Sequence, residues 1–181
     1  MVGKTISRKH DSPLYIGQTG ETPLGKLWIA VSERGLVAIE DGMQRDEFLA
    51  YLRKRFKRAV ADDPGRVRAA ARQLQDYLAG KRTGFGLPID WSVLTRFQQA
   101  ALRATCAIPA GETRTYNEIA RQIGHPRAAR AVGRAEATNP LPLVIPCHRV
   151  VGTDGKLHGY GFGQGLKTKT WLQDMERAAK K

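Results

Sequence analysis

The chain has 181 residues, of which 41% are apolar and 26% are charged. This composition is typical of a globular protein with a hydrophobic core, and it excludes a collagen-like, a disulfide-rich or a wholly disordered chain. Lysine and arginine total 30, aspartate and glutamate total 17, and the formal net charge is +13. So basic a chain favours a polyanionic partner, such as nucleic acid or an anionic membrane surface.

Only two cysteines occur, Cys106 and Cys147. This low number suits a reducing compartment in which both thiols stay free. The polar segment 1–13, which we take as a loose tail, lacks the apolar stretch of a secretory signal, and no run of about 18 apolar residues is present to span a bilayer. We therefore expect a cytoplasmic protein with no membrane partner.

The first half of the chain predicts a β-hairpin followed by two helices. Apolar, β-rich runs over 26–31 and 36–39 flank a turn signal at 33–35. Helical spacing of apolar residues then covers 44–58 and 66–78. The outer face of the first helix is basic, which indicates either a solvated surface, the more frequent case, or a nucleic-acid contact.

A connector rich in glycine and proline, 84–88, leads us to divide the chain into domains 1–88 and 89–181. Helical spacing resumes over 95–106, and the apolar face of that helix predicts that Cys106 is a small core residue. The apolar run 141–145 predicts a strand, and a last helix covers 167–179 after a glycine-rich loop.

Residues 115–135 have the spacing of a helix-turn-helix. Thr115 fits the cap of a helix over 116–123, and Pro126 fits the first position of a second helix over 127–135. One face of this second helix consists of small residues, and the other carries Arg127, Arg130 and Arg134. A thin basic helix can approach DNA closely, although an αα-hairpin with a solvated basic face has the same spacing.

The segment Pro146-Cys147-His148-Arg149 combines a thiol with two groups that can activate it. A thiol attacks as the thiolate, which a nearby imidazole or guanidinium favours. A carboxylate would orient the histidine, and Glu176 is the candidate. The alternative is a buried strand cysteine beside polar residues. The cysteines and histidines form no set with metal-ligand spacing, so we predict no metal.

These motifs, in this order, resemble the O6-alkylguanine-DNA alkyltransferases, or methylated-DNA–protein-cysteine methyltransferases. The matches run from Thr95 to Glu176, nearly half of the chain, and the first half is similar more weakly. The resemblance rests on Phe97-Gln98, Ile108-Pro109-Ala110-Gly111-Glu112-Thr113, Tyr116, Glu118-Ile119-Ala120, Arg130-Ala131-Val132-Gly133, Asn139-Pro140, Ile145-Pro146-Cys147-His148-Arg149-Val150, Gly159-Tyr160-Gly161, Trp171-Leu172 and Glu176.

The resemblance implies an α+β fold. An N-terminal α/β part with a small antiparallel sheet would precede a mostly helical, winged helix-turn-helix domain that carries the reactive cysteine. It also implies repair of DNA by direct reversal, in which an alkyl group moves once from O6-alkylguanine to the protein. No cofactor is needed, the partner is double-stranded DNA containing alkylated guanine, and we expect a monomer. Activity on O4-alkylthymine stays open.

The resemblance also implies roles for single residues. Cys147 would accept the alkyl group, and His148 would take the thiol proton through a water, oriented by Glu176. Asn139 would brace the active-site turn, and Tyr116 would crowd the phosphate and the flipped base. Arg130 would fill the gap left in the base stack. The other expected DNA-binding residues are Thr115, Arg127, Arg134 and Arg149, and those expected to line the substrate pocket are Val150, Tyr160, Gly161 and Lys169.

Three departures from the family pattern affect these expectations. Ala101-Leu102 replace the usual Val-Trp, so core packing differs. The loop between Tyr160 and Trp171 is two residues longer, which bears on pocket width and leaves open whether Lys167 or Lys169 takes the place of the family lysine. Glu136 near the end of the second helix should slightly weaken phosphate binding.

Two other functions are alternatives to alkyl transfer. A relative that only recognises lesions would lack the acceptor cysteine, which this chain has. A cysteine hydrolase usually takes its histidine from a distant segment, and it would not account for the basic helix.

Overall fold

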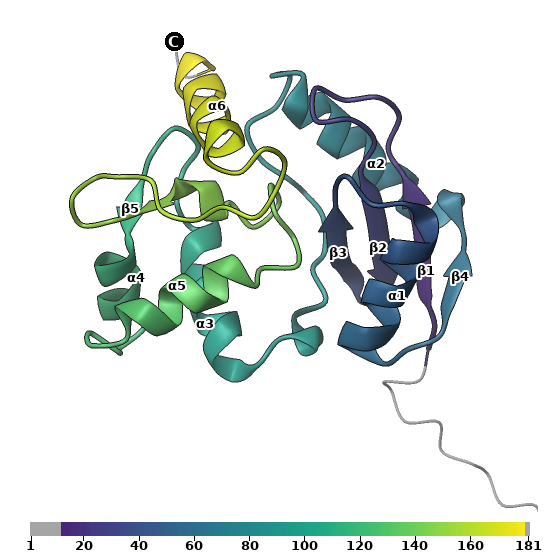
Figure 1. Ribbon diagram of the computed structural model, residues 1–181, viewed down its shortest axis with the longest axis horizontal. Coiled ribbons are helices and arrows are strands. Elements are labelled where there is room, and N and C mark those ends of the chain that lie inside the picture. Colours follow the sequence, from purple (N-terminus) through teal and green to yellow (C-terminus); the bar gives the residue numbers. More distant parts are fainter. Residues whose placement is uncertain (1–11, 180–181) are drawn as a thin grey trace, which may run out of the picture.

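The computed structural model describes residues 12–179, so nearly all of the predicted tail at 1–13 lies outside the described residues. A sheet with two helices, which we call the sheet half, stands beside a cluster of helices, which we call the helical half (Figure 1). This arrangement confirms the α+β class. Among residues 12–179, no helix is long and apolar enough to cross a membrane.

The sheet half contains four strands in the order β3-β2-β1-β4. They are β1 (Leu14–Gln18), β2 (Trp28–Ser32), β3 (Gly35–Glu40) and β4 (Val60–Asp62). The β2–β3 hairpin confirms the predicted one. The sheet is mixed rather than wholly antiparallel, because β4 pairs with β1 in parallel. This edge strand has three residues, two of them exposed, and so gave no hydrophobic pattern to detect.

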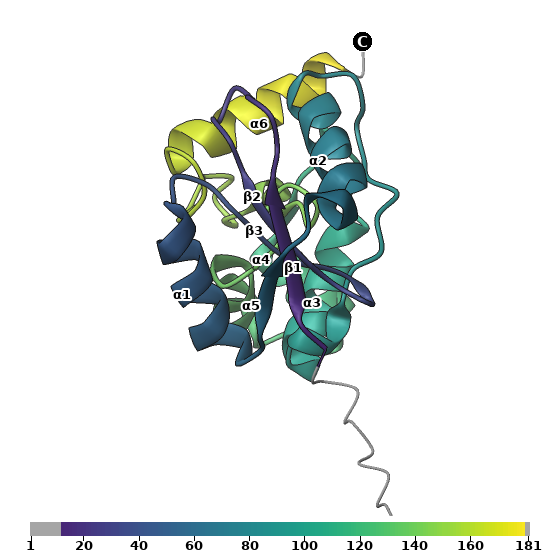
Figure 2. The same cartoon turned by 90° about the vertical axis from the view of Figure 1, so that its right-hand side faces the viewer.

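Two helices cover opposite faces of this sheet, α1 (Arg45–Phe56) and α2 (Pro64–Leu78) (Figure 2). Successive strand residues point to opposite faces, so Trp28 and Ala30 pack with Phe48 of α1, whereas Ile29 and its neighbours pack with α2. Helix α2 begins two residues before its predicted start. The Asp63 side chain caps it by accepting from the Arg66 N–H, and proline fits the first turn.

The connector between the halves lies along the edge of β3. The Leu36 N–H donates to the Pro88 carbonyl at 2.8 Å, and the Asp90 N–H donates to the Leu36 carbonyl at 2.9 Å. Gly35 has a φ of +132°, and a Cβ there would collide with the Pro88 carbonyl. Glycine is therefore required for this close approach.

The helical half contains α3 (Arg96–Cys106), α4 (Tyr116–Gln122), α5 (Ala129–Ala137) and α6 (Leu166–Ala178). The short strands β5 (Arg114–Thr115) and β6 (Val150–Val151) pair in parallel. The predicted helices are all present, but α5 begins at Ala129 rather than Arg127. A turn closed by the Ala128 N–H and the His125 carbonyl, at 2.9 Å, takes up Pro126 and Arg127 first.

Two other predictions about this half are wrong. The run 141–145 is buried but folds as turns, with Leu143 at a φ of +73°, because an apolar run predicts burial and not conformation. Cys106 is exposed rather than in the core. It lies two residues, about 200° of helical rotation, beyond the buried Ala104, and so it points away from the apolar face.

One hydrophobic core joins the two halves. Leu27 and Tyr77 of the sheet half belong to the same buried cluster as Leu141, Leu143 and Leu172 of the helical half. The two backbones also meet, since the Ile39 N–H donates to the Pro140 carbonyl at 2.8 Å. The turns at 141–145 therefore lie at this junction, and Cys147 follows directly.

Candidate active site

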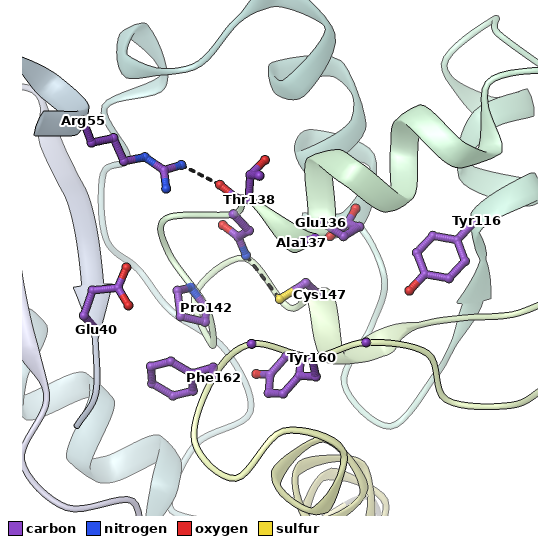
Figure 3. A pocket seen from close by; sticks show the side chains of 13 residues that line it. Glu40, Arg55, Tyr116, Glu136, Ala137, Thr138, Pro142, Cys147, Tyr160 and Phe162 are labelled. Atoms are coloured by element: carbon purple, nitrogen blue, oxygen red, sulfur yellow. Dashed lines mark hydrogen bonds between the residues drawn. The ribbon is translucent and has the colours of Figure 1, made fainter. Parts of the chain in front are cut away.

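Cys147 lies in a cavity of about 120 Å³ between the two halves (Figure 3). It begins a one-turn 3₁₀ helix, Cys147–Arg149, and is 7% exposed. Glu40 and Arg55 of the sheet half form part of the cavity wall. The helical half supplies the rest: Tyr116, Glu136, Ala137, Thr138, Asn139, Pro142, Gly159, Tyr160, Gly161 and Phe162.

Asn139 fixes both the turn and the thiol. Its side-chain amide donates to the Ile145 carbonyl at 3.0 Å and to the Cys147 sulfur at 3.3 Å, and its Oδ1 accepts from the Leu141 N–H at 2.9 Å. Burial raises the pKa of the Cys147 thiol to about 12, the charge of Glu136 adds to this, and the Asn139 bond opposes it. The resting thiol is therefore protonated and needs a base before it can attack.

The imidazole of His148 is fully buried beside the cysteine in sequence. Its Nε2 lies 3.0 Å from Glu176 Oε1 and 3.3 Å from the Tyr77 hydroxyl, which itself donates to Glu176 Oε1 at 2.5 Å. Burial lowers the pKa of His148, so the ring is neutral. With its proton on Nε2 toward the carboxylate, the ring keeps a free lone pair on Nδ1. Nδ1 is buried and has no hydrogen-bond partner within residues 12–179.

Glu176, on α6, is held by donors from four directions. Besides His148 and Tyr77, Arg149 donates from Nε at 3.0 Å to Oε2 and from Nη2 at 2.7 Å to Oε1, and the Gly111 N–H donates to Oε2 at 3.0 Å. Burial alone would raise the pKa of Glu176, but the hydrogen bonds from His148 and Arg149 outweigh it and hold that pKa well below its usual range. The carboxylate is ionised.

Arg149 does not face DNA, contrary to prediction. It is 6% exposed, and besides its bonds to Glu176 its Nη1 donates to the Ile108 carbonyl at 2.5 Å. The buried carboxylate needs a cation, and Arg149 is its ion-pair partner.

Val150 and Lys169, predicted to line the substrate pocket, lie behind it. Lys169 is fully buried, and its ammonium donates to the Val150 carbonyl at 2.7 Å and to the His158 carbonyl at 3.2 Å. Val150 is itself buried in β6. Lys169 rather than the exposed Lys167 is thus the inward lysine of α6, and it ties that helix to the backbone next to the cavity.

The predicted DNA face is formed by α4, α5 and the turn between them. Arg127, Arg130 and Arg134 are all exposed there. Arg130 lines a second cavity, of about 580 Å³, which shares Tyr116, Ala137 and Gly159 with the cavity of Cys147. Tyr116 therefore stands between the exposed arginines and the thiol.

Thr115 forms the cap of α4. Its N–H donates to Glu118 Oε2 at 2.6 Å and its hydroxyl donates to the same oxygen at 2.8 Å, so both donors are paired within this helix. The predicted cap is confirmed, and a contact of Thr115 with DNA stays a prediction.

Glu136 points inward, not toward phosphate as expected. It is 7% exposed, and its Oε1 accepts from the Thr105 hydroxyl at 2.6 Å. The sequence contained the signal for this orientation, because Glu136 follows the buried Val132 by four residues and so lies on the same face of α5.

Sequence reasoning also missed Tyr77, Glu40 and Arg55. Tyr77 looked like an ordinary core residue of α2, and nothing local to it indicated an active-site contact. Arg55, in the last turn of α1, donates to the Thr138 carbonyl at 2.5 Å, next to Asn139 (Figure 3). Arg58, which was expected on the basic outer face of the first helix, lies beyond the end of α1, and its guanidinium is 3.7 Å from the buried Asp90 carboxylate. At this residue the expected face is therefore not a solvated surface.

Comparison with known proteins places both halves in one family. Residues 15–91 match the family model described as 6-O-methylguanine DNA methyltransferase, ribonuclease-like domain, and residues 96–178 match the model described as 6-O-methylguanine DNA methyltransferase, DNA binding domain.

Named relatives agree with this match. The methylated-DNA--protein-cysteine methyltransferase of Methanosarcina barkeri is 44% identical over 151 residues, which is 81% of this chain and 89% of the relative. The protein of that name from Mycobacterium tuberculosis is 48% identical over 116 residues, which is 64% of this chain and 68% of the relative. A crystal structure of Mycobacterium tuberculosis OGT in complex with DNA has a TM-score of 0.73 and 38% identity, covering 92% of this chain and 93% of that one.

Proposed function

Because the chain belongs to the 6-O-methylguanine DNA methyltransferase family, we propose that it repairs DNA by moving the alkyl group from O6 of guanine to Cys147. The observation that carries this proposal is the position of Cys147, whose sulfur lies in a small cavity and which is followed in the chain by a neutral, buried histidine. Such a cavity suits one extruded base, since an atom inside the duplex stack is out of reach of a buried thiol.

The transfer is a single displacement. The thiolate attacks the α-carbon of the adduct, an Sγ–C bond forms as the C–O6 bond breaks, and the purine leaves with the electron pair of the broken bond. The proton that the thiol gives up ends on the purine. The products are guanine and S-alkylcysteine, and because a thioether is a poor leaving group, each molecule acts once.

His148 acts as the base through Nδ1, by way of a water molecule. Glu176 fixes the useful tautomer by accepting the Nε2 proton at 3.0 Å and stabilises the imidazolium that forms. Arg149 and Tyr77 keep that carboxylate ionised and in place. These three are positioning residues, because none of them touches the reacting atoms.

The extruded nucleotide passes Tyr116, and Arg130 fills the gap it leaves in the stack. Support comes from the cavity that Arg130 lines, which shares Tyr116 in its wall with the cavity of Cys147. Tyr160 supplies a buried hydroxyl that has no partner within residues 12–179 and so is free to bond a base edge. Arg127 and Arg134 neutralise phosphates on either side.

Mass spectrometry tests this function directly. The intact protein is incubated with DNA containing O6-methylguanine, and we expect a gain of one methyl group that peptide mapping assigns to Cys147. Cys147→Ser should gain nothing while still binding DNA. A methyl group on the exposed Cys106, or none on any residue, would contradict the proposal.

A further inference from the structure

Glu136 has a buried carboxylate oxygen without a partner in the wall of the active cavity. Its Oε1 accepts from the Thr105 hydroxyl, but Oε2 has no hydrogen-bond partner among residues 12–179. In Figure 3 the side chain is seen between Cys147 and Tyr116, and its charge contributes to raising the pKa of both.

A buried polar oxygen left unpaired destabilises a fold, and most such groups have partners. No cation of the described chain forms an ion pair with Glu136. Lys169 comes close enough to lower the pKa of Glu136, but its ammonium donates to two backbone carbonyls. Contacts within the protein therefore do not explain why a carboxylate oxygen is buried at this position.

Resting on the proposed function, we infer that Glu136 is a specificity-determining residue that favours O6 adducts whose alkyl chain carries a hydroxyl group. The α-carbon must meet the Cys147 sulfur, so the remainder of a longer chain has to occupy what is left of a cavity of about 120 Å³. Glu136 is part of the wall of that cavity. Oε2 is buried in the free protein, and an apolar chain beside it leaves it without a partner.

A hydroxyl group satisfies Oε2 whether the carboxyl is ionised or neutral, because it can donate to a carboxylate and accept from a carboxylic acid. Sites with a buried polar group discriminate against analogues that cannot pair with it. A methyl adduct ends at the α-carbon and does not reach Oε2, so Glu136 should not affect its selection.

The test compares two adducts of equal chain length, O6-(2-hydroxyethyl)guanine and O6-propylguanine, in the same duplex. The second-order rate of alkylation is measured by intact mass for wild type, Glu136→Gln, Glu136→Met and Glu136→Leu. Intrinsic reactivity cancels when the hydroxyethyl-to-propyl rate ratio of a variant is divided by that of wild type. Glu21→Gln, which changes an exposed carboxylate outside the cavity wall, is the matched control.

We expect the Met and Leu variants to lower this ratio by about tenfold, the size of one lost neutral hydrogen bond. Glu136→Gln should keep this ratio within about threefold of wild type, because an amide also donates and accepts. Glu21→Gln should leave the ratio unchanged. An unchanged ratio in either folded apolar variant, or an equal fall in Glu136→Gln, would overturn the inference.

The methyl adduct separates this inference from the proposed function. If wild type transfers methyl but the ratios do not respond to Glu136, the inference alone fails. If wild type transfers no alkyl group at all, the proposed function fails first.

Discussion

Two buried regions meet at Cys147, and they differ in how well their polar groups are paired. Behind the thiol, Glu176 accepts hydrogen bonds from His148, Tyr77, Arg149 and the Gly111 backbone. In the cavity wall, by contrast, one oxygen of Glu136 and the hydroxyl of Tyr160 have no partner within residues 12–179. The first region is built to hold one arrangement, and the second is built to receive a ligand.

The pKa shifts follow the same division. Hydrogen bonds keep the pKa of Glu176 low, so its charge is permanent. In the wall, burial raises the pKa of Glu136 to about 7 and that of Cys147 to about 12. Burial thus favours the neutral form of both groups in the wall, whereas the hydrogen bonds around Glu176 favour its charged form.

The largest effect should come from breaking the paired region. Arg149→Leu leaves Glu176 buried without its cation, and we expect a loss of about 3–5 kcal/mol in the free energy of unfolding. Urea denaturation measures this loss. Arg177→Leu is the matched control, because its ion pair with Asp174 at 3.1 Å is exposed and should contribute no more than about 1 kcal/mol. Equal losses in the two variants would erase the contrast between buried and surface pairs.

In the unpaired region, removing a charge should instead raise the free energy of unfolding. The pKa of Glu136 rises from 4.5 to about 7 on folding, so the folded state binds more protons between these values and wild-type stability falls as pH rises through that window. Ionisation of buried Glu136 lowers the free energy of unfolding by about 3 kcal/mol at pH 8 and has almost no effect below pH 4.5.

Glu136→Gln removes the titration and keeps the bond to Thr105. Its gain in unfolding free energy over wild type should therefore be larger at pH 8 than at pH 5, as measured by urea denaturation at both pH values. A constant difference between the two proteins would mean that Glu136 does not titrate in this window.

Arg130 lies outside both regions and should affect extrusion of the nucleotide alone. Arg130→Ala should slow repair of duplex DNA by about tenfold to a hundredfold, given that flipping costs a few kcal/mol. Arg130→Lys should slow it less, because lysine keeps the charge but lacks the planar group. The alkylation rate with free O6-benzylguanine, which needs no flipping, should stay near wild type in both variants. If Arg130→Ala slowed the free base equally, its role would be in the pocket or the fold.

The smallest effect should come from removing one of the four donors to Glu176. Tyr77→Phe removes the hydroxyl that bonds Glu176 and should lower the free energy of unfolding by about 1.5 kcal/mol, the range for a bond to a charged group. Thermal or urea denaturation gives this value. No measurable loss in Tyr77→Phe would mean that the three remaining donors hold Glu176 without the Tyr77 hydroxyl.

The sequence predicted the features that depend on local periodicity. Helical spacing placed α1 to α6 to within a few residues, and the turn at Gly35 placed the hairpin. The segment containing Cys147 was found because its residue types are unusual together. Glu136 was misplaced although its spacing from Val132 indicated the inner face, since a charged residue on a basic helix was assumed to be exposed.

What depends on distant packing could not be predicted in this way. Tyr77 and Glu176 are 99 residues apart and meet only because one core joins the two halves. From its sequence position Arg149 was predicted to contact DNA, because the carboxylate that it pairs with, Glu176, is distant in the chain. The run 141–145 was predicted to be a strand because a buried turn and a buried strand have the same apolar composition.

The pH dependence of alkylation shows whether His148, oriented by Glu176, is the base that deprotonates the thiol. The rate of methyl transfer to Cys147 is measured for wild type and Glu176→Gln across the pH range in which both stay folded. Without the carboxylate His148 is a poorer base, so the variant should be slow near neutral pH and recover part of its rate as pH rises and hydroxide deprotonates the thiol. Slowing by the same factor at every pH would contradict the claim and leave Glu176 a purely structural role.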